Sequence, residues 1–150
     1  MKDKILLLLG IALVVWSFYM VLGQPAPESY QNYSLLKIGD NTIQVELADT
    51  NEKRSHGLSG RDPLSQDTGL LFIFENIGIY GFWMKDMKFS IDIVWIDEMW
   101  QVIGVERDVS PNTYPKTFYP NRAVKYVLEI NSGEASRLGI DIGQQVFFDR

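Results

Sequence analysis

Residues 81–97 read GFWMKDMKFSIDIVWID, a largely apolar stretch in which Lys85 is followed seven residues later by Asp92. Residues 91–96 form a short and nearly continuous apolar run, which is typical of a strand buried on both faces. Because an unpaired buried charge is strongly unfavourable, Asp92 requires a cation or hydrogen-bond donors. The stretch therefore predicts a buried strand with a charged group inside it.

Lys85 is the cation nearest to Asp92 in sequence, and Arg61 and Arg54 are the other candidate partners. The register of the turn between Lys85 and Asp92 decides whether the two side chains share a face, because a slip of one residue reverses the face. One interpretation is an ion pair that stabilises a hairpin. The alternative is a polar pocket, lined by Lys85, Arg61 and Asp92 beside Phe82 and Trp83, which would suit a small anionic or polar ligand.

A carboxylate pair for glycoside cleavage could be drawn from Asp86, Asp92, Asp97 and Glu129. An enzymatic alternative uses Asp92 or Glu129 as an acid/base, with Lys85 or Arg61 as the electrophile. His56 is the only histidine and cysteine is absent, so the common zinc sites lack their ligands. We interpret His56 as a solvated residue at a helix end, and the sequence predicts neither a metal site nor a cofactor.

Apolar runs on both sides of this stretch predict an α+β domain with a curled, mainly antiparallel sheet or partial barrel. The strands are expected to be short and separated by turns. The segments that alternate in polarity or are continuously apolar are residues 42–47, 69–74, 91–96, 100–106, 123–130 and 144–148. Residues 110–120, with three prolines and three aromatic residues, predict a loop.

Two short helices complete the predicted domain. Asp49 and Glu52 resemble a capping box, which predicts a helix over residues 50–56 that ends at Gly57. A two-turn helix is expected in SGEASRLG, capped by Ser132.

The amino-terminal segment is long and apolar enough to span a membrane. Residues 5–22 form eighteen consecutive residues without a charge, and Lys2 and Lys4 precede them. A stretch of about 18 apolar residues is the length of a transmembrane helix, and the lysines favour an amino terminus in the cytoplasm. A cleaved signal peptide is the alternative interpretation.

These features divide the chain into three parts. Residues 1–23 are the predicted membrane anchor or signal segment, residues 24–32 a linker and residues 33–150 a single extracytoplasmic domain. We therefore expect a single-pass protein of the cytoplasmic membrane, with the amino terminus inside and the domain outside, or a secreted protein if the leader is cleaved.

The charge balance argues against a nucleic-acid partner. The chain has 14 lysines and arginines against 19 acidic residues, a formal net charge of −5. It also lacks a basic block, the usual electrostatic signature of nucleic-acid binding.

Four motifs occur in order along the chain: HGLSGRDPL, GLLFIF, GFWMKDMKFSIDIVWID and YVLEINSG. Together they resemble a widespread prokaryotic family of uncharacterised small domains, over nearly the whole chain from residue 42 to residue 148. The resemblance implies a compact α+β domain with a curled, mainly antiparallel sheet, often exported behind an amino-terminal hydrophobic segment. It implies no settled activity.

The resemblance covers all five residues of the candidate site. Its characteristic positions are Gly57, Leu58, Arg61, Phe72, Phe74, Phe82, Trp83, Met84, Lys85, Asp92, Glu129 and Gly133. The chain departs from the family pattern at Asp86, Met87 and Ser90.

The leading functional hypothesis is a membrane-anchored extracytoplasmic module that binds a small polar ligand, an envelope polymer or a partner protein. The candidate site comprises Arg61, Trp83, Lys85, Asp92 and Glu129. The alternatives are a hydrolase of cell-envelope polymer and a purely structural network of buried charges.

Overall fold

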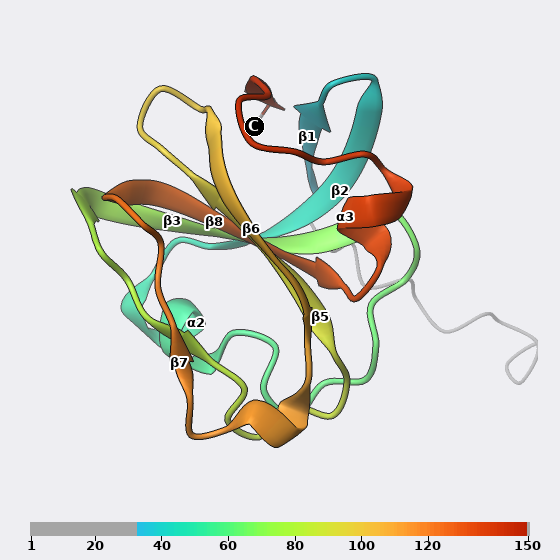
Figure 1. The fold of residues 1–150 in the computed structure, drawn as a ribbon, viewed down its shortest axis with the longest axis vertical. Coiled ribbons are helices and arrows are strands. Elements are labelled where there is room, and N and C mark those ends of the chain that lie inside the picture. The colour runs from blue at the N-terminus through green and yellow to red at the C-terminus, as the bar shows by residue number, and fades with distance from the viewer. Residues whose placement is uncertain (1–32, 150) are drawn as a thin grey trace, which may run out of the picture. The chain divides into compact units, whose positions relative to one another are not determined.

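The computed structural model describes residues 33–149, in which a seven-stranded sheet and a two-stranded sheet are the main elements (Figure 1). The strands of the large sheet, in spatial order, are β6 (Val102–Val109), β5 (Ile91–Ile96), β8 (Val124–Asn131), β3 (Thr68–Gly78), β2 (Asn41–Ala48), β1 (Ser34–Ile38) and β9 (Val146–Asp149). The small sheet pairs β4 (Phe82–Trp83) with β7 (Thr117–Phe118). The helices are α2 (Asn51–His56), the 3₁₀ helix η1 (Pro111–Thr113) and α3 (Glu134–Arg137).

The large sheet is antiparallel except between β2 and β3, which run parallel. Parallel neighbours need a crossover connection, and α2 with the loop after it provides that connection. The predicted α+β class and mainly antiparallel sheet are therefore confirmed.

The sheet curls until its two edges approach each other. Gln101, just before β6, forms an isolated antiparallel bridge with Gln145, just before β9. The amide of Val146 also donates to the carbonyl of Trp100 at 2.7 Å. The predicted partial barrel is thus present, and its two edge strands meet at one end.

Two apolar clusters lie on the two faces of the central strands. One face packs with β1, β9 and α3, and its buried residues include Leu71, Val94 and Leu128. The other face packs against β4, β7 and the loop after α2, and its buried residues include Leu58, Phe72 and Trp95. Figure 1 shows α2 and β7 together on one side of the crossing strands, and β1 and α3 on the other.

The helix ends differ from the sequence prediction in their capping residues. Thr50, not Asp49, is the N-cap of α2, and its hydroxyl accepts from the amide of Lys53 at 3.3 Å. Gly57 ends α2 as predicted. Helix α3 is shorter than the predicted two turns, and Ser132 does not cap it.

Two further differences concern strands. Strand β1 was not predicted. The predicted loop at residues 110–120 is largely irregular but contains η1 and the short strand β7.

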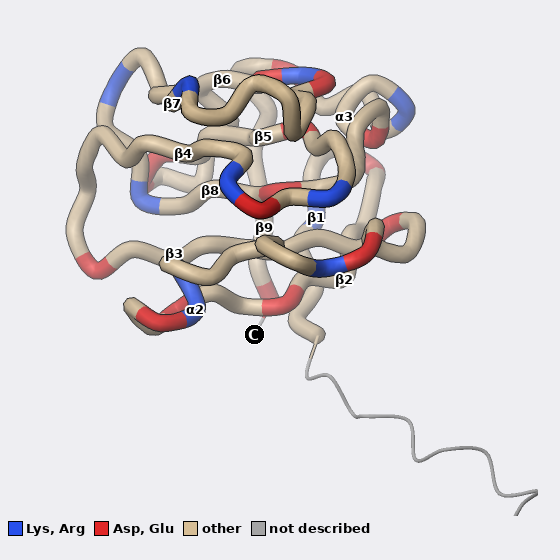
Figure 2. The backbone as a smooth tube through the Cα atoms, turned by 90° about the horizontal axis from the view of Figure 1, so that it is seen from below, with Lys and Arg blue, Asp and Glu red and all other residues tan. Residues whose placement is uncertain are grey.

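The predicted membrane anchor and linker lie outside the described residues. Within residues 33–149, no helix is long and apolar enough to cross a membrane. Basic and acidic residues alternate along the described chain instead of forming one basic block (Figure 2).

Candidate functional site

A cavity of about 330 Å³ lies between α2, the loop after it, β3, β4 and β8, on the sheet face that packs against β4 and β7. We call it the aromatic pocket. Its aromatic walls are Phe72, Phe74, Tyr80, Phe82 and Trp83. Its polar lining residues are Asn51, Arg54, Ser55, His56, Ser59 and Glu129.

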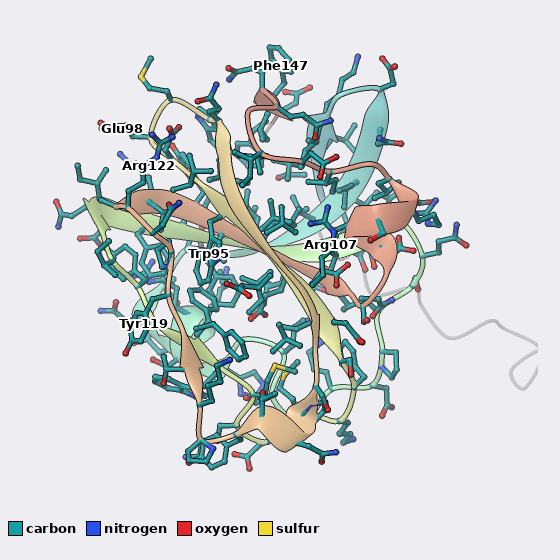
Figure 3. All side chains as sticks on the ribbon, in the orientation of Figure 1. Trp95, Glu98, Arg107, Tyr119, Arg122 and Phe147 are labelled. Carbon is teal, nitrogen blue, oxygen red and sulfur yellow. The ribbon has the colours of Figure 1, made fainter. Side chains whose placement is uncertain are left out.

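The aromatic walls are held by packing among themselves. Phe74 and Tyr80 stack with ring centroids 3.6 Å apart and planes 7° apart. Phe82 meets Phe72 edge-on at 4.9 Å, and it meets Trp95 edge-on at 5.3 Å. Figure 3 shows Trp95 on the side of β5 where α2 and β7 lie. Because these contacts fix the rings, the walls are formed before any ligand arrives.

Glu129 enters the pocket from the central strand β8. It lies opposite Leu70 of β3 and Ile93 of β5, so the three side chains share one face of the sheet. Glu129 is only 5 % exposed, and its Oε2 is buried without a hydrogen-bond partner. Burial raises the pKa of Glu129 to about 8, so its carboxyl group is mostly protonated at neutral pH.

The arginine that lines the pocket is held by other partners. Arg54 donates from Nη1 to the carbonyl of Ile73 at 2.8 Å and from Nη2 to Oδ1 of Asn51 at 2.7 Å. Its guanidinium also lies over the ring of Phe74, 5.6 Å from the centroid. Within residues 33–149, no ion pair involves Glu129.

A glycine brings α2 close to the buried carboxyl group. Gly57 has φ 53° and ψ −131°, a conformation that side chains with a Cβ rarely adopt. A Cβ at this position would lie 3.3 Å from Cζ of Phe72 and 4.0 Å from Oε2 of Glu129. Gly57 therefore both ends α2 and leaves space in the pocket.

Asp92 lies on the opposite face of the same sheet. It is fully buried, and its two oxygens accept from the amides of Asp108 at 2.8 Å and Ala135 at 2.9 Å. Ala135 is in the first turn of α3, whose N-cap, Gly133, supplies no side-chain hydrogen bond. Backbone amides at the start of α3 and at the end of β6 are therefore the partners of Asp92. They take the place of the cation that the sequence predicted.

Arg61 and Lys85 also lie apart from the pocket lining. Arg61 forms two hydrogen bonds to Glu46, at 2.9 and 2.6 Å, and these bonds raise the pKa of Arg61. The side chain of Lys85 is exposed and forms no ion pair with the described residues. Its carbonyl accepts from the hydroxyl of Ser59 at 2.9 Å, which joins the turn at Lys85 to the loop after α2.

Of the five sequence-predicted site residues, the structure thus brings together Trp83 and Glu129. Phe72 and Phe74 were identified only as family positions and not as site residues, and Tyr80 was not predicted at all. The alternation of Phe72 and Phe74 in GLLFIF placed them on one strand face, but which strand lies opposite them is not encoded locally. No group of three His, Asp or Glu side chains within residues 33–149 is arranged to hold a metal ion.

Relatives of the chain come from both archaea and bacteria. A UPF0127 protein of Pyrococcus abyssi (strain GE5 / Orsay) is 33% identical over 108 residues, which cover 69% of this chain and 84% of that protein. A proposed transcription regulator from Sinorhizobium meliloti 1021 has a similar structure, with a TM-score of 0.74 and 25% identity over 77% of this chain and 93% of that one.

A protein of unknown function from Novosphingobium aromaticivorans DSM 12444 also has a TM-score of 0.74, with 26% identity over 83% of this chain and 91% of that one. The model of the family DUF192, described as "Uncharacterized ACR", matches residues 34–148. The chain therefore belongs to the uncharacterised family DUF192.

Proposed function

We propose that the domain binds a small molecule in the aromatic pocket and that Glu129 is the polar group that orients it. One observation carries the proposal: Oε2 of Glu129 is buried, has no hydrogen-bond partner and belongs to a residue that lines a cavity with aromatic walls. Buried polar atoms are nearly always hydrogen-bonded, so an exception needs an explanation. A ligand that bonds to Oε2 provides one.

The dimensions and lining of the pocket support this proposal. Its volume of about 330 Å³ is at the lower end of the range of roughly 300–1,000 Å³ for ligand sites, which suits a small ligand. Such sites combine apolar walls with a few polar groups. Trp83, which is 54% exposed, extends the aromatic wall to the surface and gives a ligand a first contact.

The test is a fragment screen by ligand-observed NMR against the wild-type protein and three variants. E129Q keeps the shape of the side chain, and W83L shortens an exposed wall residue without opening the core. E98Q makes the same chemical change as E129Q at an exposed position (Glu98 is labelled in Figure 3). Fragments that bind wild type and E98Q but bind more weakly to E129Q or W83L support the proposal. A screen without any such fragment refutes it.

A hydrolase in which Glu129 acts as the general acid is the second candidate function. A general acid must hold its proton at the working pH, and burial gives Glu129 a pKa of about 8. Asp92 does not suit this role, because amides occupy both of its oxygens on the other face of the sheet. Turnover of an envelope polymer that E129Q abolishes and D92N preserves per folded molecule would favour this candidate. Turnover that survives E129Q would exclude Glu129.

We further propose that residues 1–23 anchor the protein in the cytoplasmic membrane and that the domain lies outside the cytoplasm, where the envelope would supply its ligand. The uncharged run at residues 5–22 and the lysines before it support this proposal. A reporter enzyme that is active only outside the cytoplasm, fused after residue 150, should be active and sediment with membranes. An inactive, soluble fusion would contradict it.

A nucleic-acid partner is not part of the proposal, although one similar structure comes from a proposed transcription regulator. A net charge of −5 provides no general attraction for phosphates.

A further inference from the structure

The chemistry of the aromatic pocket narrows the class of ligand. A buried carboxyl oxygen is an acceptor, and its strongest partner is a positively charged N–H donor. Aromatic ring faces carry negative partial charge and attract cations. Five aromatic residues and Glu129 line this one cavity together with Arg54, whose guanidinium already lies over the Phe74 ring. The Glu129 oxygen and the rings that Arg54 does not cover can therefore attract a second cation.

We propose that the ligand is a small primary amine with an apolar body, whose ammonium group donates to Oε2 of Glu129 while its body lies against Phe72, Phe74 and Phe82. This inference rests on the proposed function and specifies the charge of the ligand. A primary ammonium has three N–H donors, so it satisfies an oxygen that the described residues leave without a partner. A quaternary ammonium has no N–H and would leave that oxygen unsatisfied.

The other charged or titratable groups of the pocket are Arg54, His56 and Tyr80. Arg54 is fixed by Ile73, Asn51 and the Phe74 ring, and His56 is exposed. The strand neighbours that face Glu129, Leu70 and Ile93, are apolar. The repulsion between Arg54 and an amine favours an orientation in which the ammonium lies near Glu129 and the apolar body fills the space toward α2.

The proposal implies that binding releases a proton. Burial keeps the carboxyl group of Glu129 protonated at neutral pH. An ammonium is best paired with the carboxylate, so the acid loses its proton to solvent as the ammonium–carboxylate pair forms. The affinity for an amine must therefore rise as the pH increases toward the pKa of Glu129. The affinity of a neutral ligand that accepts from the protonated acid must fall over the same interval.

The test is isothermal titration calorimetry with 2-phenylethylamine and with 2-phenylethanol, which replaces the ammonium by a hydroxyl group. Both are titrated at about pH 6 and about pH 8, into wild type, E129Q, E98Q and H56Q. H56Q removes the histidine of the pocket lining, so a pH dependence that persists in this variant does not come from His56. The comparison of the amine with the alcohol measures the effect of the ligand's charge on affinity. E98Q is the control for the loss of an acidic group at the surface.

The expected result is that the amine binds wild type at least about tenfold more tightly than the alcohol at the higher pH. Its affinity should rise by about tenfold or more between the two pH values in wild type, E98Q and H56Q. E129Q should lose this pH dependence and at least about tenfold of the amine affinity, with little change for the alcohol.

Two results would overturn the inference in distinguishable ways. If the alcohol binds as tightly as the amine, and W83L titrated in the same way binds both more weakly, the ligand is neutral and the proposed function stands. If neither probe binds, or E129Q leaves amine binding unchanged, an ammonium site at Glu129 is excluded. The fragment screen then decides independently whether the pocket binds any ligand.

Discussion

Asp92 and Glu129 lie on the paired central strands β5 and β8, yet their side chains point to opposite faces of the sheet. Asp92 is opposite Ile130, and Glu129 is opposite Ile93. This offset of one residue places Asp92 against α3 and Glu129 in the aromatic pocket. The two buried acids therefore have different environments: amide donors surround Asp92, whereas Oε2 of Glu129 has none.

Asp92 is expected to be structural. In D92N an NH₂ group of the side-chain amide replaces one carboxylate oxygen and faces a backbone N–H. Two donors then face each other, so a buried hydrogen bond is lost and a donor is left unsatisfied. Hydrogen bonds to charged groups contribute about 1.5–3 kcal/mol, so we expect D92N to lower the free energy of unfolding by about 3 kcal/mol. Urea unfolding of wild type and D92N measures this loss. The control is D40N, which makes the same change at an exposed aspartate. Equal stability of D92N and D40N would contradict the capping role.

Glu129 should make the stability of the domain depend on pH. Its pKa is about 8 when folded, against 4.5 for the exposed group, so the folded state holds the extra proton between these values. Stability therefore falls as the pH rises from about 4.5 and levels off above about 8. The total loss is on the order of 5 kcal/mol.

E129Q has no titrating group at this position. Its free energy of unfolding should therefore lack the pH dependence that Glu129 gives to the wild type. Urea unfolding of wild type and E129Q at about pH 5 and about pH 8.5 measures the effect. The difference between the two proteins should shift in favour of E129Q at the higher pH. A difference that is the same at both pH values would mean that Glu129 is not buried as described.

Lys85 is not expected to stabilise the fold, because its side chain is exposed and pairs with no described acid. K85M should change the free energy of unfolding by less than about 0.5 kcal/mol. R61M, which breaks the two bonds to Glu46, should cost about 1 kcal/mol. A loss of several kcal/mol in K85M would instead indicate a buried ion pair at this lysine.

Gly57 should matter for both stability and ligand binding. G57A forces a Cβ into an unfavourable backbone conformation and to within 3.3 Å of Phe72, so we expect a loss of about 1–3 kcal/mol. The added methyl group also narrows the pocket, so ligands should bind more weakly. G139A is the control, since Gly139 also has positive φ but its Cβ would meet nothing within 4 Å. Pocket ligands that bind G57A and G139A equally well would place the site elsewhere.

The sequence predicted the strands well where local pattern determines them. Residues 91–96 are all buried, as the continuous apolar run indicated. The alternation at residues 123–130 likewise identified β8. Strand β1 was missed because its five residues, SLLKI, are too short to show a clear period.

The candidate site was less accessible to sequence reasoning, because it depends on register between distant strands. The sequence could not show that Asp92 lies opposite Ile130 and that Glu129 lies opposite Ile93. A shift of one residue in this pairing would have placed the two acids on the same face of the sheet. The backbone donors that bind Asp92 could not be predicted from the sequence either. The amides that bind Asp92 belong to Asp108 and Ala135, which are 16 and 43 residues away.

A buried, protonated Glu129 in the aromatic pocket is the basis of the proposed ligand site. A ¹³C NMR titration of the glutamate carboxyl groups measures this property directly, and E129Q assigns the signal. We expect Glu129 to stay protonated at neutral pH and to titrate at about 8. Titration in the ordinary range of an exposed glutamate, near 4.5, would contradict this expectation and would remove the basis for an ammonium ligand.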